Sequence, residues 1–238
     1  MAENHAARMR LLFSGAPQPV TPDELAAREA EAERRDNADR QWREEMQEQS
    51  RRNRLVRSGI PLARIGWTWE TAPASSAPHV AQLREVNARR GSALLLGSSG
   101  TGKTGLAIGA MQDAIAAERS TLFVLLPLLL VDLNDCYRVE GMSRGDLIRR
   151  YTGPDSPDLL VIDDLGAELR DTEAVRGDVW LIIEMRQAND KPMIITTNCD
   201  RDELRKRYDE RTFSRLREFA MVTVNGDDQR GRRKGGAA

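Results

Sequence analysis

Gly97-Ser98-Ser99-Gly100-Thr101-Gly102-Lys103-Thr104 is the stretch that decides the fold of this 238-residue chain. Its spacing, G-x-x-x-x-G-K-[ST], is that of the P-loop, a glycine-rich turn that binds phosphate groups. The apolar run 93–96 before it suits a buried strand, and the segment 105–115 after it has an apolar stripe at helical spacing. Because strand, loop and helix follow one another as the motif requires, the sequence predicts a phosphate-binding loop.

The residue types in this loop indicate ATP and Mg²⁺ as ligands. Its glycines allow backbone N–H groups to turn toward phosphate oxygens, and the start of the next helix adds a partial positive charge. We expect Lys103 to reach the β- and γ-phosphates and Thr104 to place its hydroxyl on Mg²⁺. The chain has 36 lysines and arginines but few lysines, which makes a lysine at this point informative. The expected nucleotide-binding residues are Gly97, Ser98, Ser99, Gly100, Thr101, Gly102, Lys103, Thr104 and Gly105.

Two carboxylates follow the apolar residues 159–162, where a buried strand is expected to end. A P-loop ATPase needs a carboxylate for Mg²⁺ at this point, and Asp163 suits that role. Asp164 suits the role of accepting a proton from the attacking water. The alternative is an Asp-Asp turn that only solvates the end of a strand.

Two further polar groups are candidates for catalysis. Asn198 follows the apolar run 193–195 and Thr196-Thr197, where it would contact the γ-phosphate or the attacking water, unless it only forms a turn. Arg211 and Arg215 are four residues apart and share a helix face. In an oligomeric ATPase, an arginine on such a helix can reach the γ-phosphate of the neighbouring subunit. The alternative for both is a solvated basic face.

The remaining pattern alternates apolar strands with amphipathic helices, which predicts a parallel five-stranded α/β sheet with helices on both faces. Such sheets bind ligands at the carboxyl ends of their strands. The expected strands lie near 92–96, 121–126, 158–163, 192–197 and 220–224. The expected helices lie near 103–117, 128–137, 143–151, 172–188 and 201–217, with another over 79–90.

Ahead of this core we expect a helical arm, residues 1–57, and a linker, residues 58–90, so that the core is 91–238. Thr21 and Glu24 have the spacing of a capping box, and strong helix formers without Gly or Pro continue to Arg57. Trp42 and Met46 share a face of this charged helix. The arm is either a solvated extension or a docking helix for another protein.

The composition excludes several classes of protein. Acidic and basic residues nearly cancel, 37 against 36, so only local patches can favour nucleic acid. Cys136 and Cys199 are isolated, which argues against a zinc site and favours reduced thiols. No segment is long and apolar enough to cross a membrane, so we expect a cytoplasmic protein. In the linker, Trp67 and Trp69 either pack against the core or stack on nucleic acid bases.

The order of these motifs resembles AAA+ ATPases of the DnaC/DnaI helicase-loader and IstB transposition-helper group. The match covers about residues 58–231, and the arm has no counterpart in it. The resemblance assigns Lys103 and Thr104 to Walker A, Asp163 and Asp164 to Walker B, and Asn198 to sensor 1. It also implies Arg215 as the arginine finger and Arg230 as the sensor 2 residue. About fourteen residues follow the last strand, too few for the helical lid of many AAA+ proteins. The quoted motifs are the P-loop, Ser58-Gly59-Ile60-Pro61, Leu160 to Gly166, Thr196-Thr197-Asn198, Glu210 to Leu216 and Gly226-Asp227-Asp228-Gln229-Arg230.

By this resemblance the chain is expected to be an ATP-dependent loader of a replicative DNA helicase. The arm would bind the helicase, ATP would drive self-association, and the segment 128–151 would meet single-stranded DNA. Its basic residues are Arg138, Arg144, Arg149 and Arg150. The alternatives are an ATPase helper of a transposase and a nucleotide-gated DNA-binding adaptor with little turnover. A small-molecule kinase is disfavoured by Asp163-Asp164 together with Asn198.

Overall fold

The structure is a computed structural model that describes residues 21–72, 74–136, 142–168 and 171–226. These residues form two units, one ending at Gln49 and the other beginning at Ser50. Most of helix α2 (Pro22–Arg57) lies in the first unit, and none of its residues is buried. The backbone N–H of Glu24 donates to Thr21 Oγ1, and that of Thr21 donates to Glu24 Oε2. The capping box and the long charged helix are therefore confirmed.

The second unit contains a five-stranded parallel sheet in the order β2-β3-β4-β1-β5. Its strands lie within one or two residues of the predicted limits, because each combines an apolar run with polar or glycine residues at its ends. Their bounds are Ala93–Leu96 (β1), Thr121–Leu125 (β2), Leu159–Leu165 (β3), Met193–Thr197 (β4) and Ala220–Thr223 (β5).

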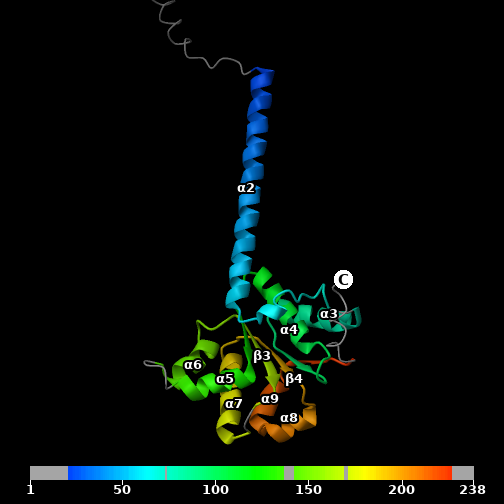
Figure 1. The fold of residues 1–238 in the computed structure, drawn as a ribbon, viewed down its shortest axis with the longest axis vertical. Coiled ribbons are helices and arrows are strands. Elements are labelled where there is room, and N and C mark those ends of the chain that lie inside the picture. Colours follow the sequence, from blue (N-terminus) through cyan, green and yellow to red (C-terminus); the bar gives the residue numbers. More distant parts are fainter. Residues whose placement is uncertain (1–20, 73, 137–141, 169–170, 227–238) are drawn as a thin grey trace, which may run out of the picture. The chain divides into compact units, whose positions relative to one another are not determined.

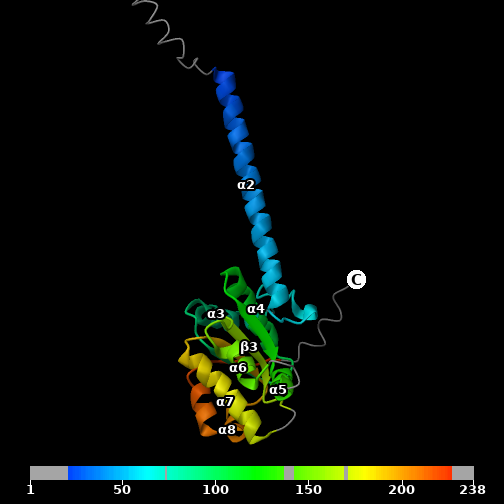
Figure 2. The same ribbon diagram turned by 90° about the vertical axis from the view of Figure 1, so that its left-hand side faces the viewer.

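Helices cover both faces of the sheet, and β3 lies between α4 and α7 in both ribbon views (Figures 1 and 2). Alternate strand residues face opposite sides. Leu94 and Leu96 pack with α5 to α9, whereas Ala93 and Leu95 pack with α3 and α4. The predicted two-sided α/β fold is confirmed. The helices are Ala77–Ala88 (α3), Lys103–Ala116 (α4), Leu126–Asp135 (α5), Arg144–Thr152 (α6), Glu173–Ala188 (α7), Arg201–Arg207 (α8) and Glu210–Leu216 (α9), with short 3-10 turns Leu62–Arg64 (η1) and Ala74–Ser76 (η2).

The single helix predicted over 201–217 is wrong, because the chain breaks between α8 and α9. Tyr208 has an extended backbone (φ −105°, ψ 151°), and its ring is only 2% exposed. Asp209 then starts a new helix by accepting a hydrogen bond from the N–H of Thr212. The helical pattern of the sequence continues through this segment. Burial of the Tyr208 ring and capping of α9 by Asp209 nevertheless favour a break in the helix.

The linker, residues 58–90, packs against the core. Ser58 O accepts a hydrogen bond from the N–H of Phe123 on the edge strand β2. The indole N–H of Trp69 donates to Leu106 O at 3.0 Å, and the ring is buried. A side chain at Gly109 would put its Cβ only 1.9 Å from that ring. The interpretation of Trp69 as a packing residue is therefore confirmed.

None of the helices in the described part of the chain is both long and apolar enough to cross a membrane.

Candidate nucleotide site at the carboxyl edge of the sheet

The P-loop connects β1 to α4 and needs its glycines for steric reasons. Gly97, Gly100 and Gly102 have φ angles of 155°, 85° and 97°, which L side chains rarely adopt. A Cβ at Gly97 would lie 2.2 Å from Val224 O on the neighbouring segment. Thr101 Oγ1 donates to Ser98 O and closes the turn. The loop thus brings the N-terminus of α4 to the carboxyl edge of the sheet.

Lys103 is the first residue of α4, and its ammonium group lies over the loop. Nζ donates to Gly97 O at 2.7 Å, to Ser98 O at 2.8 Å and to Asn198 Oδ1 at 2.8 Å. The last contact joins two residues that are 95 positions apart in the chain. It places Asn198, at the end of β4, beside the P-loop.

Asp163 lies directly opposite the start of α4. Its Oδ1 accepts hydrogen bonds from Thr104 Oγ1 at 2.9 Å and from Thr196 Oγ1 at 2.7 Å. Burial raises the pKa of the Asp163 carboxyl and the charge of Asp164 adds to this, while the two threonine hydroxyls and Arg64 oppose it. A carboxylate and a hydroxyl at this distance form a hard-oxygen site suited to Mg²⁺.

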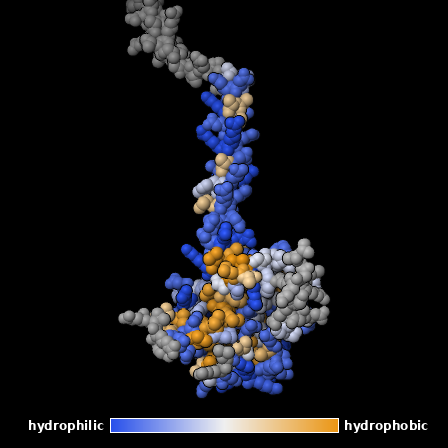
Figure 3. All heavy atoms as spheres, in the orientation of Figure 1, coloured by the Kyte–Doolittle hydropathy of each residue, from blue (hydrophilic) through white to orange (hydrophobic). Residues whose placement is uncertain are grey.

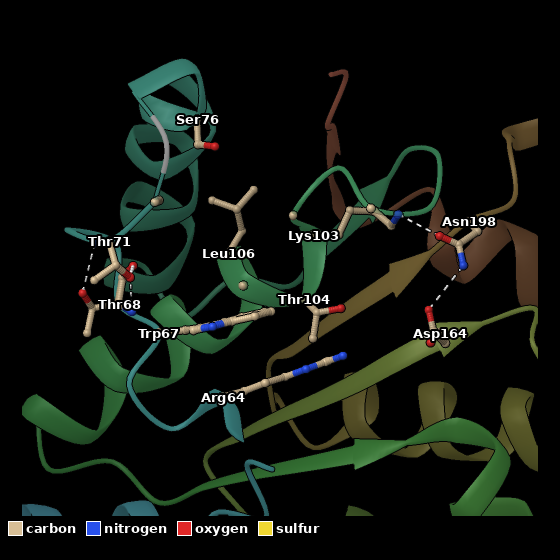
Figure 4. A pocket seen from close by; sticks show the side chains of 14 residues that line it. Arg64, Trp67, Thr68, Thr71, Ser76, Lys103, Thr104, Leu106, Asp164 and Asn198 are labelled. Atoms are coloured by element: carbon tan, nitrogen blue, oxygen red, sulfur yellow. Dashed lines mark hydrogen bonds between the residues drawn. The ribbon is translucent and has the colours of Figure 1, made fainter. Parts of the chain in front are cut away.

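The backbone of Asp164 adopts a left-handed conformation, with φ 63°. The pairing of β3 with β4 shifts register between Ile162 and Leu165, which is a bulge at this residue. Bulges of this kind change the direction in which a side chain points. Here the carboxylate faces Asn198, whose Nδ2 lies 3.4 Å from Asp164 Oδ1 (Figure 4). The strained backbone and the bulge together distinguish Asp164 from Asp163, the carboxylate that is expected to bind the metal.

Lys103, Thr104, Asp164 and Asn198 line one pocket, and residues of the linker also line it (Figure 4). Asp163 is buried behind this lining and reaches it through its hydrogen bond with Thr104. Trp67 lies flat against the start of α4, where a Cβ on Gly105 would meet Trp67 Cε3 at 3.1 Å. Trp67 was expected either to pack against the core or to stack on nucleic acid bases, and a place in this pocket was not predicted. The linker residues in the pocket are Arg64, Trp67, Thr68, Thr71, Ala72 and Ser76; the core residues are Gly100, Gly102, Lys103, Thr104, Gly105, Leu106, Asp164 and Asn198.

A magnesium ion fits the groups that the structure brings together. Mg²⁺ is usually bound by one or two carboxylates, with substrate phosphates and water completing its shell. Asp163 and Thr104 match that requirement. Among the described residues, no group of three or more His, Cys, Asp and Glu side chains is arranged to hold a metal ion, so nothing there resembles an all-protein metal cage.

Arg215 does not lie in this pocket. Its guanidinium binds Glu184 through Nε (2.5 Å) and Nη2 (2.9 Å), and Glu218 through Nη1 (3.2 Å). Arg211 stacks its guanidinium over Trp180 at 5.2 Å. Both arginines of α9 are thus fastened to α7 or to their own helix end. Arg230, the expected sensor 2 residue, lies outside the described residues.

The strand order, the P-loop after β1 and the two carboxylates near the end of β3 together define an AAA+ P-loop NTPase fold. Comparison with protein families gives a more specific result. A family model described as IstB-like ATP binding protein matches residues 31–235, and the chain belongs to that family. The match begins inside α2, which corrects the expectation that the whole arm has no counterpart.

Individual curated proteins are also similar to this chain. The replicative helicase loader DnaC of Escherichia coli K12 is 27% identical over 154 residues, which are 63% of this chain and 60% of the relative. The DnaC of Shigella flexneri matches to the same extent. The chain thus spans about 60% of the length of these curated relatives.

Solved structures resemble the fold at lower sequence identity. A DnaI structure has a TM-score of 0.60 at 19% identity and covers 72% of this chain and 94% of its own. A DnaC helicase loader structure has a TM-score of 0.59 at 19% identity, with 69% of this chain and 100% of its own covered. The AMPPCP-bound DnaA of Aquifex aeolicus has a TM-score of 0.58 at 20% identity, with coverages of 68% and 50%. At these identities the likeness shows the fold.

Proposed function

We propose that this protein is an ATPase that loads a replicative DNA helicase and uses ATP binding and hydrolysis as a switch. The observation that carries the ATPase part is the chain of contacts from Lys103 through Asn198 to Asp164, beside the Thr104–Asp163 pair. These contacts support a phosphate-binding role for Lys103, a metal-binding role for Asp163 and a role as base for Asp164. The partner part is supported by the 27% identity to the helicase loader DnaC.

Each residue has a role that its contacts support. Lys103 exchanges carbonyl oxygens for the β- and γ-phosphate oxygens of ATP, and the P-loop N–H groups bind the same phosphates. Asp164 accepts the proton of the attacking water, while Asn198 orients that water and links it to Lys103. When bound at Thr104 and Asp163, Mg²⁺ neutralises charge on the β- and γ-phosphates.

The linker residues that line the pocket are candidates to bind the base and ribose of the nucleotide. Trp67 and Leu106 are apolar, while Thr68, Thr71 and Ser76 offer hydroxyls in the same pocket. A flat apolar surface with a few polar groups suits a purine base and its ribose. The part of the linker from Arg64 to Ser76 therefore belongs to the proposed nucleotide site.

For the nucleic acid partner we propose single-stranded DNA, bound by the segment 128–151. The arginines there differ in their surroundings. Arg144 forms a tight pair with Asp178 and also donates to Leu133 O, so we now assign it a structural role. Arg149 pairs with Asp146 on the exposed side of α6, and Arg150 is exposed. Arg138 lies outside the described residues. This leaves Arg149 and Arg150 as the candidates for phosphate contacts.

A transposase helper is a second candidate, because the matching family is that of IstB-like ATP binding proteins. Both candidates share the core and differ in the protein partner, so a helicase or a transposase gene beside this one would separate them. A nucleotide-gated DNA-binding adaptor is a third candidate. The rate of ATP hydrolysis separates it from the first two, because the adaptor would hydrolyse little ATP.

Two variants test the ATPase assignment. Lys103→Ala removes a charged donor to the phosphates, so ATP affinity should fall roughly tenfold to a hundredfold in calorimetry. Asp164→Asn keeps the shape but loses the base, so turnover should fall by a factor on the order of 10² to 10⁴ without a matching loss of affinity. Turnover is measured with and without single-stranded DNA, at two salt concentrations. Equal loss of affinity in both variants would contradict the separate roles, and turnover near zero in the wild type would favour the adaptor.

A further inference from the structure

Arg64 brings a positive charge to the carboxylate expected to bind the metal. Its Nη1 lies 3.6 Å from Asp163 Oδ2, and Asp163 is nearly inaccessible, with a side chain 3% exposed. The other oxygen, Oδ1, already accepts two hydroxyl hydrogen bonds. Oδ2 is therefore the oxygen that faces a cation, and in this structure the cation is a guanidinium.

The contact of the Arg64 guanidinium with Asp163 is loose enough to be broken. At 3.6 Å the pair is an ion pair without a close hydrogen bond, and the Arg64 side chain is 39% exposed. Its Cζ lies 5.2 Å from the centre of the Trp67 ring, which supports the guanidinium from one side. In Figure 4 the side chain extends below Thr104 toward the end of β3. It lines the same pocket as Lys103 and Thr104.

We propose that Arg64 is a resident counter-ion of Asp163, which takes the place of Mg²⁺ in the nucleotide-free protein and competes with Mg²⁺ for this carboxylate. The inference rests on the proposed ATP-binding function of the same pocket. Two cations cannot share Oδ2 cheaply, since like charges a few ångströms apart in a partly buried site repel strongly. When the metal binds, the guanidinium leaves Asp163 for the solvent, to which the Arg64 side chain is already 39% exposed.

The consequence is a change in how strongly ATP binding depends on Mg²⁺. Without metal, Arg64 offsets the charge of Asp163 and so reduces its repulsion of the triphosphate. With metal, the ion performs that task and Arg64 is dispensable for it. Removing the charge of Arg64 should therefore weaken ATP binding mainly when Mg²⁺ is absent. When Mg²⁺ is present, the same change removes the cation that competes with it for Asp163.

The experiment compares Arg64→Gln with Arg64→Lys, two side chains of similar length that differ in charge. Affinity for a non-hydrolysable ATP analogue is measured by calorimetry in Mg²⁺ and in EDTA, in the full chain. The gain in affinity on adding Mg²⁺ should be roughly tenfold larger in Arg64→Gln than in the wild type. Arg64→Lys should stay near the wild-type gain. Arg89→Gln is the matched control and should not change the gain; Arg89 is an exposed arginine directly after α3 that pairs with Glu85.

Three outcomes would overturn the inference. An equal loss of affinity in Mg²⁺ and EDTA would make Arg64 a simple phosphate ligand. If Mg²⁺ increased the affinity of Arg64→Gln only as much as that of the wild type, the ion pair would have no influence on Mg²⁺ dependence. If Mg²⁺ increased the affinity of Arg64→Lys more than that of the wild type, the charge of residue 64 would not be the cause. Thermal unfolding of each variant checks that the linker still packs on the core. If the wild type fails to bind the analogue in Mg²⁺, the proposed function fails first, which is a distinct result.

Discussion

At the scale of single residues, Arg186 on α7 shows how one buried side chain joins distant segments. The residue is fully buried, and its guanidinium donates to Tyr151 O at 2.6 Å, Pro157 O at 3.0 Å and Pro192 O at 2.8 Å. Burial lowers the pKa of Arg186 to about 10, but the group remains charged at neutral pH. It fastens the end of α6 and the turns before β3 and β4 to a single point.

Replacing Arg186 by Met should destabilise the protein by about 3 kcal/mol, because several buried carbonyls lose their donor and an unsatisfied buried polar group costs about 1–3 kcal/mol. Urea unfolding followed by circular dichroism measures the change. The exposed control Arg89→Ala should stay within about 0.5 kcal/mol of the wild type. A loss below about 1 kcal/mol for Arg186→Met would mean that water replaces the guanidinium.

At the scale of elements, α9 is fastened to α7 by two arginine contacts, Arg211 on Trp180 and Arg215 on Glu184. We propose that Arg215 acts on the ATP of a neighbouring subunit when the protein self-associates. Because Arg215 is bidentate on Glu184 in the single chain, it must exchange that carboxylate for a phosphate on assembly. Glu184 would then keep the guanidinium oriented until a neighbour arrives.

Arg215→Ala should bind ATP normally and hydrolyse it more slowly by a factor on the order of 10³, since a finger acts on charge that develops during transfer. Steady-state turnover measures this, with the exposed Arg205→Ala on α8 as the matched control. Mixing Arg215→Ala with Lys103→Ala should restore part of the turnover, because one variant keeps a pocket and the other keeps a finger. Co-assembly without any recovery would show that Arg215 does not act in trans.

At the scale of the whole molecule, the chain combines an ATPase-like core with a helix that buries no side chain. Figure 3 shows α2 as hydrophilic along most of its length, with isolated apolar positions. Trp42 is 63% and Met46 50% exposed, and they lie four residues apart on one face. We propose that these two side chains anchor the helicase.

The double variant Trp42→Ala/Met46→Ala in the full chain should weaken helicase binding by roughly tenfold or more, because large apolar anchors dominate interface energies. Leu25→Ala removes a similarly exposed apolar group, 52% accessible, from the same helix and should have little effect. Surface plasmon resonance against the purified helicase compares them. Deletion is better made up to Gln49 than up to Arg57, because Arg54 donates to Ile115 O and Leu55 packs on the core. Full binding by the double variant would leave the arm as a solvated extension.

The sequence by itself determined the P-loop, the alternation of strands and helices, and the meeting of three polar groups at one edge of the sheet. Asp163, Asp164 and Asn198 were predictable as neighbours because they lie at or just beyond the carboxyl ends of parallel strands, and parallel strands end at the same edge. The long helix was predictable for a similarly local reason, since a capping box and helix-forming residues need no tertiary contact to be recognised.

Only the tertiary structure decided which distant side chains meet. The Arg64–Asp163 pair, the bond from Lys103 to Asn198 and the bonds from Arg186 to Tyr151 O and Pro157 O join residues far apart in the chain, and no periodicity encodes them. The break at Tyr208 was missed for the same reason, because a helical pattern continues through it while burial of the ring bends the backbone. Local propensity specifies elements, whereas ion pairs and packing depend on the sheet order that brings those elements together.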